Sequence, residues 1–376
     1  MKKTACYVHI PFCDHKCIYC DFYSIITSDN ISNYLNAIKK EIEYYSNIYS
    51  IDRELFTVYF GGGTPSLMNP AYIKEIINHI KNKFNVSVNA EITLETNPGT
   101  VDLNKFIEFK KAGINRISVG IQSFDKEELK FLTRIHDSET AADTINKAKQ
   151  AGFENISLDL IFNLPGQTKE KWMYNLQRAV ELPIKHISAY SLILEKGTIL
   201  NKMVIDGKVK MQDEDYDAEL YEETIDFLTA SGFNQYEVSN FALPGYECIH
   251  NKAYWDYSEY LSFGTSAHSF LNNKRWWNYS SLKFYIAAVE KMNYVVAGSE
   301  ELSHEQMMEE YVMLALRGEG LHLDKLENLF GNEWKNSNNE YISDLIKKGF
   351  ITKKNNFLKF TSKGYALCDE ILSNMS

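Results

Sequence analysis

Apolar positions follow two different periods through the first 235 residues. Short continuous apolar runs typical of buried strands occur six times, at residues 5–10, 56–60, 91–96, 116–122, 156–162 and 186–193. Helical spacing follows each run, as with Leu35, Ile38, Ile42 and Tyr45, which share one helix face. Repeated strand–helix units predict an α/β fold with a parallel sheet and outer helices. Because a closed barrel needs eight units, we expect a partial, open (β/α)6 barrel.

The pattern changes after about Gln235. Residues 236–300 are rich in aromatic side chains and look irregular, and helical spacing resumes from about Glu305. Near the end, Asn355-Asn356 separates two short apolar runs, which is a hairpin signal. Helices followed by a small hairpin predict an α+β, winged-helix-like module. We therefore expect three regions: a barrel at 1–235, a connecting region at 236–300 and the C-terminal module at 301–376.

The composition of the chain limits the classes of binding partner that we expect. The chain has 376 residues and a net charge of −10, which gives no general attraction to nucleic acid or anionic lipid. Residues 301–376 hold nine Lys/Arg against twelve Asp/Glu, so the C-terminal module is not an evident DNA-binding unit. No apolar run reaches the ~18 residues of a membrane span, and no signal peptide is evident. We expect a cytoplasmic protein without nucleic-acid partners, and peripheral membrane contact stays open.

Three of the six cysteines crowd together directly after the first strand. Cys13, Cys17 and Cys20 have the spacing C-x3-C-x2-C. Clustered thiolates are ligands of iron–sulfur clusters, and three of them leave one iron of a cubane open. A zinc site is the alternative, in which His9 or His15 would supply a fourth ligand. Both alternatives stay open on spacing alone.

Polar motifs stand at the ends of successive predicted strands. Gly61-Gly62-Gly63-Thr64 follows the second strand, and Glu95, Gln122 and Asp159 occur at or near the ends of the third, fourth and fifth. Each has a structural explanation by itself, such as a tight bend or a buried carboxylate that serves packing. Strand ends converge on one mouth in a parallel barrel, however, and barrel enzymes place their chemistry there. We therefore expect one ligand site at this mouth.

These motifs resemble those of the radical S-adenosylmethionine (SAM) superfamily. Tyr19 fits the aromatic position before the last cysteine, and Tyr7-Val8-His9-Ile10-Pro11-Phe12-Cys13 is similar to the oxygen-independent coproporphyrinogen oxidase superfamily. The resemblance covers essentially the whole chain. It implies a [4Fe–4S] cluster held by Cys13, Cys17 and Cys20, with SAM on the open iron. It further implies that SAM is held by Gly61, Gly62, Gly63, Thr64, Glu95, Gln122, Asp159 and Arg134, whose guanidinium suits a carboxylate.

Three features favour the haem-chaperone branch of this superfamily over the oxidases. The oxidase signature has a fourth cysteine two residues after the third, where this chain has Phe22. The oxidases also carry an N-terminal segment that we expect to be missing here. His250-Asn251-Lys252-Ala253-Tyr254-Trp255 matches the H-N-x-x-Y-W motif of the chaperones. The resemblance implies haem ligation by His250 and flat contacts from Tyr254 and Trp255, with the thiolate of Cys248 as a second candidate.

The resemblance implies a haem-binding protein that delivers haem to membrane haemoproteins of the respiratory chain. The alternative is radical decarboxylation of coproporphyrinogen III in porphyrin biosynthesis. Whether the chain is an enzyme stays open, no catalytic residue is assigned, and homodimer formation is undecided. A donor such as flavodoxin or ferredoxin would reduce the cluster. Because His250 follows the six strand–helix units in sequence, we expect haem to bind independently of the cluster.

Overall fold

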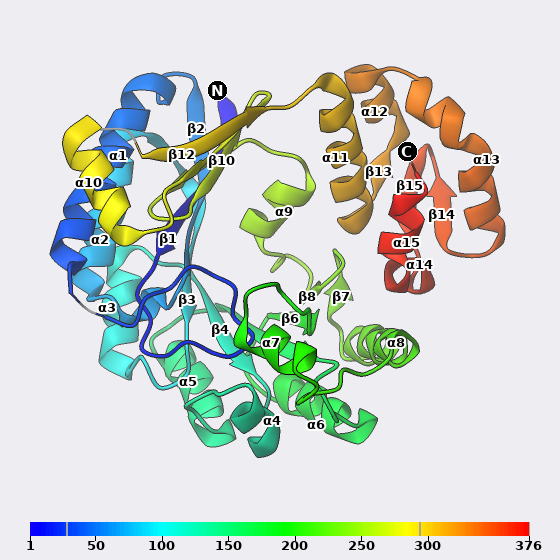
Figure 1. Ribbon diagram of the computed structural model, residues 1–376, viewed down its shortest axis with the longest axis horizontal. Helices are drawn as coiled ribbons and strands as arrows, with labels where there is room; N and C mark the ends of the chain where they lie inside the picture. Colours follow the sequence, from blue (N-terminus) through cyan, green and yellow to red (C-terminus); the bar gives the residue numbers. More distant parts are fainter. Residues whose placement is uncertain (28, 293–294, 376) are drawn as a thin grey trace.

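A single large sheet organises the protein in the computed structural model, which describes residues 1–27, 29–292 and 295–375 (Figure 1). Twelve strands of the described chain join in the order β12-β11-β10-β9-β1-β2-β3-β4-β5-β6-β8-β7. The six central strands are parallel neighbours in chain order, as the sequence predicts: β1 (Lys2–Ile10), β2 (Arg53–Gly62), β3 (Asn85–Thr96), β4 (Arg116–Gln122), β5 (Asn155–Phe162) and β6 (His186–Ser191).

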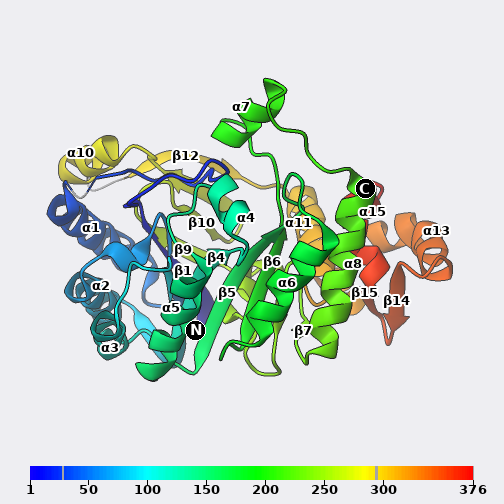
Figure 2. The ribbon, with the colours of Figure 1, turned by 90° about the horizontal axis from the view of Figure 1, so that it is seen from below.

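Helices follow the strands and cover the outer face of this sheet (Figures 1 and 2). They are α1 (Ile31–Tyr49), a short 3-10 turn η1 (Pro65–Leu67), α2 (Pro70–Lys83), α3 (Leu103–Ala112), α4 (Lys126–Phe131), α5 (Ser138–Gln150), α6 (Lys169–Val180) and α8 (Glu214–Ala230). Figure 2 shows one further short helix, α7 (Ile199–Ile205), projecting from the body before α8. The predicted α/β architecture with a partial six-unit barrel is confirmed.

Local capping explains where these helices begin and end. The side chain of Asn69 accepts from the Ala71 amide at the start of α2, where Pro70 takes the first helical position. Asp102 caps α3 in the same way, and Gly113, with a φ of 107°, ends it. Polar caps and closing glycines are readable in the sequence, which is why the predicted bounds lie close to the observed ones.

Residues 236–300 are not irregular, in contrast to our expectation. They form β8 (Asn240–Ala242), α9 (Ile249–Trp255), β9 (Tyr260–Phe263), β10 (His268–Leu271), β11 (Lys274–Asn278), α10 (Leu282–Met292) and most of β12 (Val296–Glu301), and β7 (Asn234–Gln235) precedes them. β9 pairs in parallel with β1, and β8 pairs antiparallel with β6, so the segment extends the sheet at both ends. These strands have only two to six residues, and β9 pairs with residues 255 positions away, so the segment has little local periodicity.

The C-terminal module stands beside the open side of the barrel (Figure 1). It contains α11 (His304–Arg317), β13 (Leu321–His322), α12 (Leu323–Phe330), α13 (Glu333–Lys347), β14 (Ile351–Lys354), β15 (Phe357–Phe360), α14 (Ser362–Ala366) and α15 (Cys368–Ser373). Its small sheet has the order β13-β15-β14. Asn355 and Asn356 have φ values of 50° and 58° and form the predicted hairpin turn. Two short helices, α14 and α15, follow this hairpin.

Gly264, directly after β9, is the tightest junction between β9 and β1. Its φ is +100°, and an added Cβ would lie 2.4 Å from the Tyr34 hydroxyl and 2.6 Å from the His9 carbonyl oxygen. We expect Gly264→Ala to lower the free energy of unfolding by more than about 2 kcal/mol, through strain and overpacking. Gly207→Ala is the matched control, because Gly207 has a φ of +71° with nothing within 4 Å. It should cost only about 1 kcal/mol. Equal losses in denaturant titrations would contradict this packing.

Candidate cofactor-binding site

The loop after β1 carries the three clustered cysteines and is fixed to the end of β2. The amides of Gly63 and Thr64 donate to the carbonyl oxygens of Ile10 and Phe12, both at 2.8 Å. His9 Nε2 bonds the Tyr23 carbonyl at 2.9 Å, and its Nδ1 lies 3.3 Å from the Tyr7 hydroxyl. Both ring nitrogens of His9 are therefore engaged, which disfavours it as a zinc ligand. His15 Nε2, by contrast, has no partner.

The thiols lie beside polar and cationic groups. Cys13 Sγ is 3.2 Å from Thr64 Oγ1, and Arg134 Nη1 is 3.6 Å from Cys17 Sγ. Burial and the neighbouring Cys17 raise the pKa of Cys20. Within the described ranges, no group of three or more His, Cys, Asp or Glu side chains has a geometry that could hold a metal ion. The donor set nevertheless suits an iron–sulfur cluster, since it offers three thiols on one loop beside the Arg134 guanidinium.

No side chain would fit at the glycines that follow β2. A Cβ on Gly61 would lie 2.9 Å from the Tyr7 ring, and one on Gly63 would lie 2.6 Å from the Phe12 carbonyl oxygen. Gly62 has a φ of +112°, and a Cβ there would lie 2.6 Å from the His9 ring. These contacts explain the three consecutive glycines, because protein atoms already fill the space that a side chain would need.

Two half-buried carboxylates face the interior from β3 and β5. Glu95 accepts from the Gly62 amide at 3.2 Å and from the Tyr59 hydroxyl at 2.9 Å. Burial, together with the charge of Asp159, raises the pKa of Glu95 to about 7. Asp159 accepts from the Ser118 hydroxyl at 3.2 Å, and burial raises its pKa as well. Two such carboxylates in one interior favour a cationic ligand, which the ammonium and sulfonium groups of SAM provide.

Arg134 joins three of the predicted motifs. Its Nη2 donates to the Gly120 carbonyl at 2.5 Å and to Asn97 Oδ1 at 2.8 Å, and Asn97 Nδ2 donates to Thr64 Oγ1 at 2.9 Å. Gln122 lies in the same group, since a Cβ on Gly120 would meet Gln122 Nε2 at 2.9 Å. Sequence reasoning missed Asn97, although it stands two residues after Glu95 at the end of the same strand.

Some polar atoms at this mouth have no partner within the protein. Thr93 Oγ1 on β3, Arg134 Nε and Asn163 Oδ1 after β5 are all buried and unbonded in the described structure. Buried polar atoms normally have hydrogen-bond partners, so these three unpaired atoms fit a site that receives a polar ligand. The structure thus brings together Gly61, Gly62, Gly63, Thr64, Glu95, Gln122, Arg134 and Asp159 as one group.

The His250 motif forms α9, which lies inside the barrel rather than outside the six units. His250 is 2% exposed, its Nδ1 is 2.8 Å from Thr57 Oγ1, and its Nε2 is 3.1 Å from the Tyr254 hydroxyl. Its ring stacks on Tyr59 with a centroid distance of 4.8 Å. Figure 1 shows α9 between the sheet and α11. The motif is therefore close in space to the eight residues grouped above, although it follows the barrel units in sequence. We call those residues the SAM group, because the sequence resemblance assigns them to SAM.

Glu91 on β3 holds the start of α9. Its carboxylate accepts from the amides of Ile249 at 3.2 Å and His250 at 3.1 Å, and Cys248 Sγ lies 3.6 Å away. Arg116 Nε is 3.9 Å from the same carboxylate, and both side chains are buried. At the other end of α9, Trp255 packs against Gly318 of the C-terminal module, where an added Cβ would lie 2.8 Å from Trp255 Cβ.

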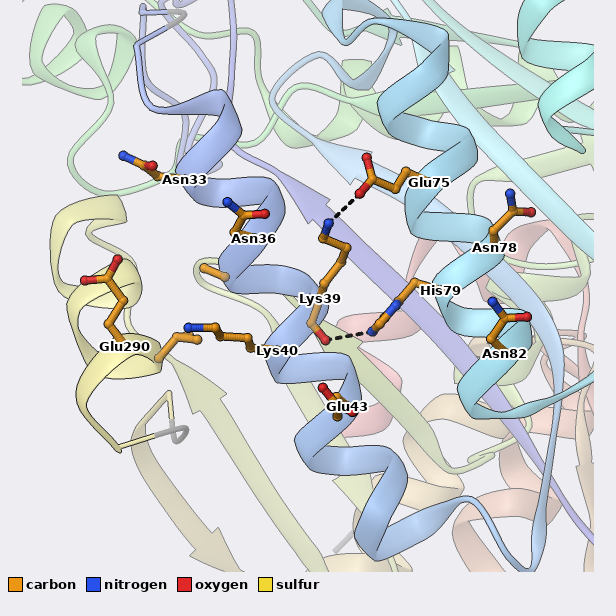
Figure 3. A pocket seen from close by; sticks show the side chains of 12 residues that line it. Asn33, Asn36, Lys39, Lys40, Glu43, Glu75, Asn78, His79, Asn82 and Glu290 are labelled. Carbon is orange, nitrogen blue, oxygen red and sulfur yellow. Dashed lines mark hydrogen bonds and ion pairs between the residues drawn. The ribbon is translucent and has the colours of Figure 1, made fainter.

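A surface groove lies elsewhere on the molecule. It encloses about 560 Å³ between α1, α2 and α10, and Figure 3 shows its polar lining. Lys39 pairs there with Glu75, and His79 Nε2 bonds the Lys39 carbonyl at 3.0 Å. These groups satisfy one another on the outer face of the barrel, remote from the cysteines and α9, so the groove carries no part of the site.

Comparisons with known proteins agree with this geometry. The sequence model of the radical SAM superfamily matches residues 7–179, and that of the HemN C-terminal domain matches residues 302–367. The heme chaperone HemW of Lactococcus lactis is 34% identical over 98% of this chain and 96% of its own length. The heme chaperone HemW of Bacillus subtilis is 33% identical over 98% of both chains.

A solved structure also matches the fold over the whole chain. Coproporphyrinogen III oxidase (HemN) from Escherichia coli, described as a radical SAM enzyme, has a TM-score of 0.85 and 25% sequence identity. The match covers 100% of this chain and 90% of that one. The barrel and the C-terminal module are therefore shared with an enzyme of this superfamily, and the fold by itself does not separate the two functions.

The cysteines can be tested by anaerobic reconstitution. We expect about four irons and four sulfides per chain, because three thiolates and one open iron fit a cubane. Cys13→Ala, Cys17→Ala and Cys20→Ala should each abolish this content, measured as iron and acid-labile sulfide. Cys6→Ala and Cys368→Ala are matched controls on cysteines remote from the loop. A full cluster in any of the first three variants would contradict the assignment.

The raised pKa of Glu95, about 7, predicts a pH dependence of SAM binding. Below that pH the free protein holds Glu95 protonated, so binding of a cationic ligand must release a proton. Affinity should then rise with pH between about pH 6 and pH 7.5, approaching tenfold per unit at the acid end. Glu95→Gln should weaken binding by about 1.5–3 kcal/mol and flatten the profile. Calorimetry at several pH values tests this, and a wild-type profile as flat as that of the variant would refute the role of Glu95.

Proposed function

The chain belongs to the HemW family of the radical SAM superfamily, and on that premise we propose that it is a haem chaperone, which binds haem and passes it to other haemoproteins. The observation that carries the proposal is similarity to heme chaperones over 98% of the chain, which includes the His250 motif on α9. That helix packs inside the barrel against β2, the strand that ends in the glycine turn. The motif therefore lies beside the residues that we assign to SAM.

The mouth of the barrel supports cofactor binding. Cys13, Cys17 and Cys20 would hold a [4Fe–4S] cluster, and Glu95 and Arg134 would orient SAM, which supplies a 5′-deoxyadenosyl radical when a reduced cluster cleaves it. Arg134 stands between Cys17 Sγ and Asn97, so it links the cluster loop to the glycine turn. Flavodoxin or ferredoxin remains our proposed class of electron donor.

His250 is the better candidate for a haem ligand than Cys248. Burial and the charge of Arg116 lower the pKa of His250 to about 3, so its imidazole is neutral and keeps a lone pair for iron. Burial raises the pKa of Cys248 to about 12, so at neutral pH it is a thiol, which is a poor ligand. Tyr254 and Trp255 flank His250 on the same helix and would supply flat apolar contacts.

The oxidase alternative is less well supported. Phe22 stands where the oxidase signature has a fourth cysteine, and 60% of its surface is exposed on the cluster loop. A phenylalanine cannot supply the thiolate of that signature. Two heme chaperones are 34% and 33% identical over 98% of the chain, whereas the matching oxidase is 25% identical. Decarboxylation of coproporphyrinogen III therefore stays the second candidate.

We propose membrane haemoproteins as acceptors and a cytoplasmic location with peripheral contact at the membrane. None of the helices in the described ranges combines the length and apolar character that a bilayer crossing needs. Delivery to such acceptors would then proceed by docking at the membrane surface. Dimer formation remains undecided.

Haem titration of the purified protein tests the function. The wild type should bind haem with a defined Soret band, and His250→Ala should shift that band or lower the haem occupancy, because iron loses its nitrogen ligand. Iron–sulfur content should not change. Cys248→Ser is the control, since loss of a thiolate ligand would give a different spectrum. Weak binding that neither variant alters, together with formation of protoporphyrinogen IX, would favour the oxidase instead.

A further inference from the structure

His250 is closed to a haem iron while α9 is docked. Its Nδ1 faces Thr57 within the sheet, so only Nε2 is available, and that atom is 3.1 Å from the Tyr254 hydroxyl. Tyr254 is itself held edge-on against Tyr260, with ring centroids 4.9 Å apart. Tyr59 covers one face of the imidazole. A macrocycle therefore cannot reach His250 Nε2 by rotation of one side chain alone.

Glu91 anchors α9 in this closed position. Its two carboxylate oxygens accept the amides of Ile249 and His250, and it is 5% exposed. Hydrogen bonds to a buried carboxylate are strong because water cannot replace them. The attachment of α9 to the C-terminal module consists of the packing of Trp255 against Gly318 and a partly exposed ion pair, Lys252 with Glu319 at 2.7 Å. Displacement of α9 from the sheet would break the buried hydrogen bonds that Glu91 accepts.

Tyr59 connects the same helix to the SAM group. One face of its ring stacks on His250 at an interplanar angle of 24°, and its hydroxyl donates to Glu95 at 2.9 Å. Glu95 in turn accepts from the Gly62 amide in the glycine turn. Tyr59 also lies 6.2 Å from the Tyr7 ring, which stacks against it on the neighbouring strand. The Tyr59 hydroxyl is thus positioned in part by α9, and it holds Glu95, the carboxylate that we assign to SAM binding.

We propose that α9 is a latch between the two sites, so that SAM binding and haem ligation by His250 oppose each other. With α9 docked, Tyr59 is supported by His250 and holds Glu95 for SAM, while His250 is closed to haem. With α9 released from Glu91, His250 Nε2 is free for iron and Tyr59 loses its stacking partner. SAM favours the docked state and haem the released state, and linkage makes the effect reciprocal. This inference rests on the proposed haem-chaperone function.

The latch can be tested on the anaerobically reconstituted full chain, with the cluster kept oxidised so that SAM is not cleaved. Haemin is titrated into the protein with and without saturating SAM and followed at the Soret band. SAM should raise the apparent Kd for haem at least about fivefold, the lower range of allosteric coupling. Haem should raise the Kd for SAM by the same factor. Amide hydrogen exchange over residues 248–255 should increase with haem and decrease with SAM.

Two variants separate the latch from direct competition for one pocket. Tyr59→Phe keeps the ring on His250 but removes the hydroxyl from Glu95, so the coupling factor should fall toward one. Tyr174→Phe, which removes an exposed hydroxyl on α6, is the matched control and should retain the full factor. Glu91→Gln weakens the anchor and should lower the Kd for haem in the absence of SAM. Glu54→Gln, on the neighbouring strand β2, should not.

The outcomes distinguish the latch from the function on which it rests. If the wild type binds haem through His250 but SAM leaves its affinity unchanged or increases it, the latch is wrong and the chaperone function stands. If the coupling persists undiminished in Tyr59→Phe, haem and SAM overlap directly and the latch is again wrong. If His250→Ala binds haem as the wild type does, the ligand assignment fails and the latch fails with it.

Discussion

Two carboxylates on one strand, the first buried and the second half-buried, organise the barrel interior. Glu91 and Glu95 lie four residues apart on β3, and because side chains alternate along a strand they face the same side. A buried carboxylate is stable only with donors around it. Glu95 takes the Gly62 amide and the Tyr59 hydroxyl, whereas Glu91 takes the first amides of α9. The glycine turn and the His250 helix are thus both positioned by the need to satisfy these two groups.

Local signals in the sequence were sufficient to predict the barrel and much of its mouth. Apolar runs bounded by polar caps and glycines gave six strands in their correct order, and Glu95 and Gln122 stand at their ends. Arg134 is different, because it belongs to no strand and was assigned only by resemblance. The structure gives this residue specific contacts, because its guanidinium donates hydrogen bonds to the Gly120 carbonyl oxygen and to Asn97 Oδ1.

Contacts between distant parts of the chain could not be predicted in this way. Glu91 reads as an ordinary residue at the start of a strand, since its partners on α9 follow 158 and 159 residues later. The parallel pairing of β9 with β1 is equally non-local, and it places residues 260–263 beside residues 5–8. The sequence interpretation therefore put the His250 motif in a connecting region, when tertiary packing had enclosed it against Thr57 and Tyr59.

The location of α9 also bears on how one fold serves two functions. Parallel barrels place their chemistry at the carboxyl ends of the strands, and this chain keeps its cysteines, glycine turn and Arg134 there, in a fold shared with an oxidase. α9 occupies the interior at the middle of the strands, where Thr57 and Glu91 are adjacent across β2 and β3. The helix that carries our proposed haem motif therefore lies inside a fold that matches an oxidase over the whole chain. It contacts Glu95 through Tyr59, so the proposed haem ligand and the proposed SAM site are neighbours within one interior.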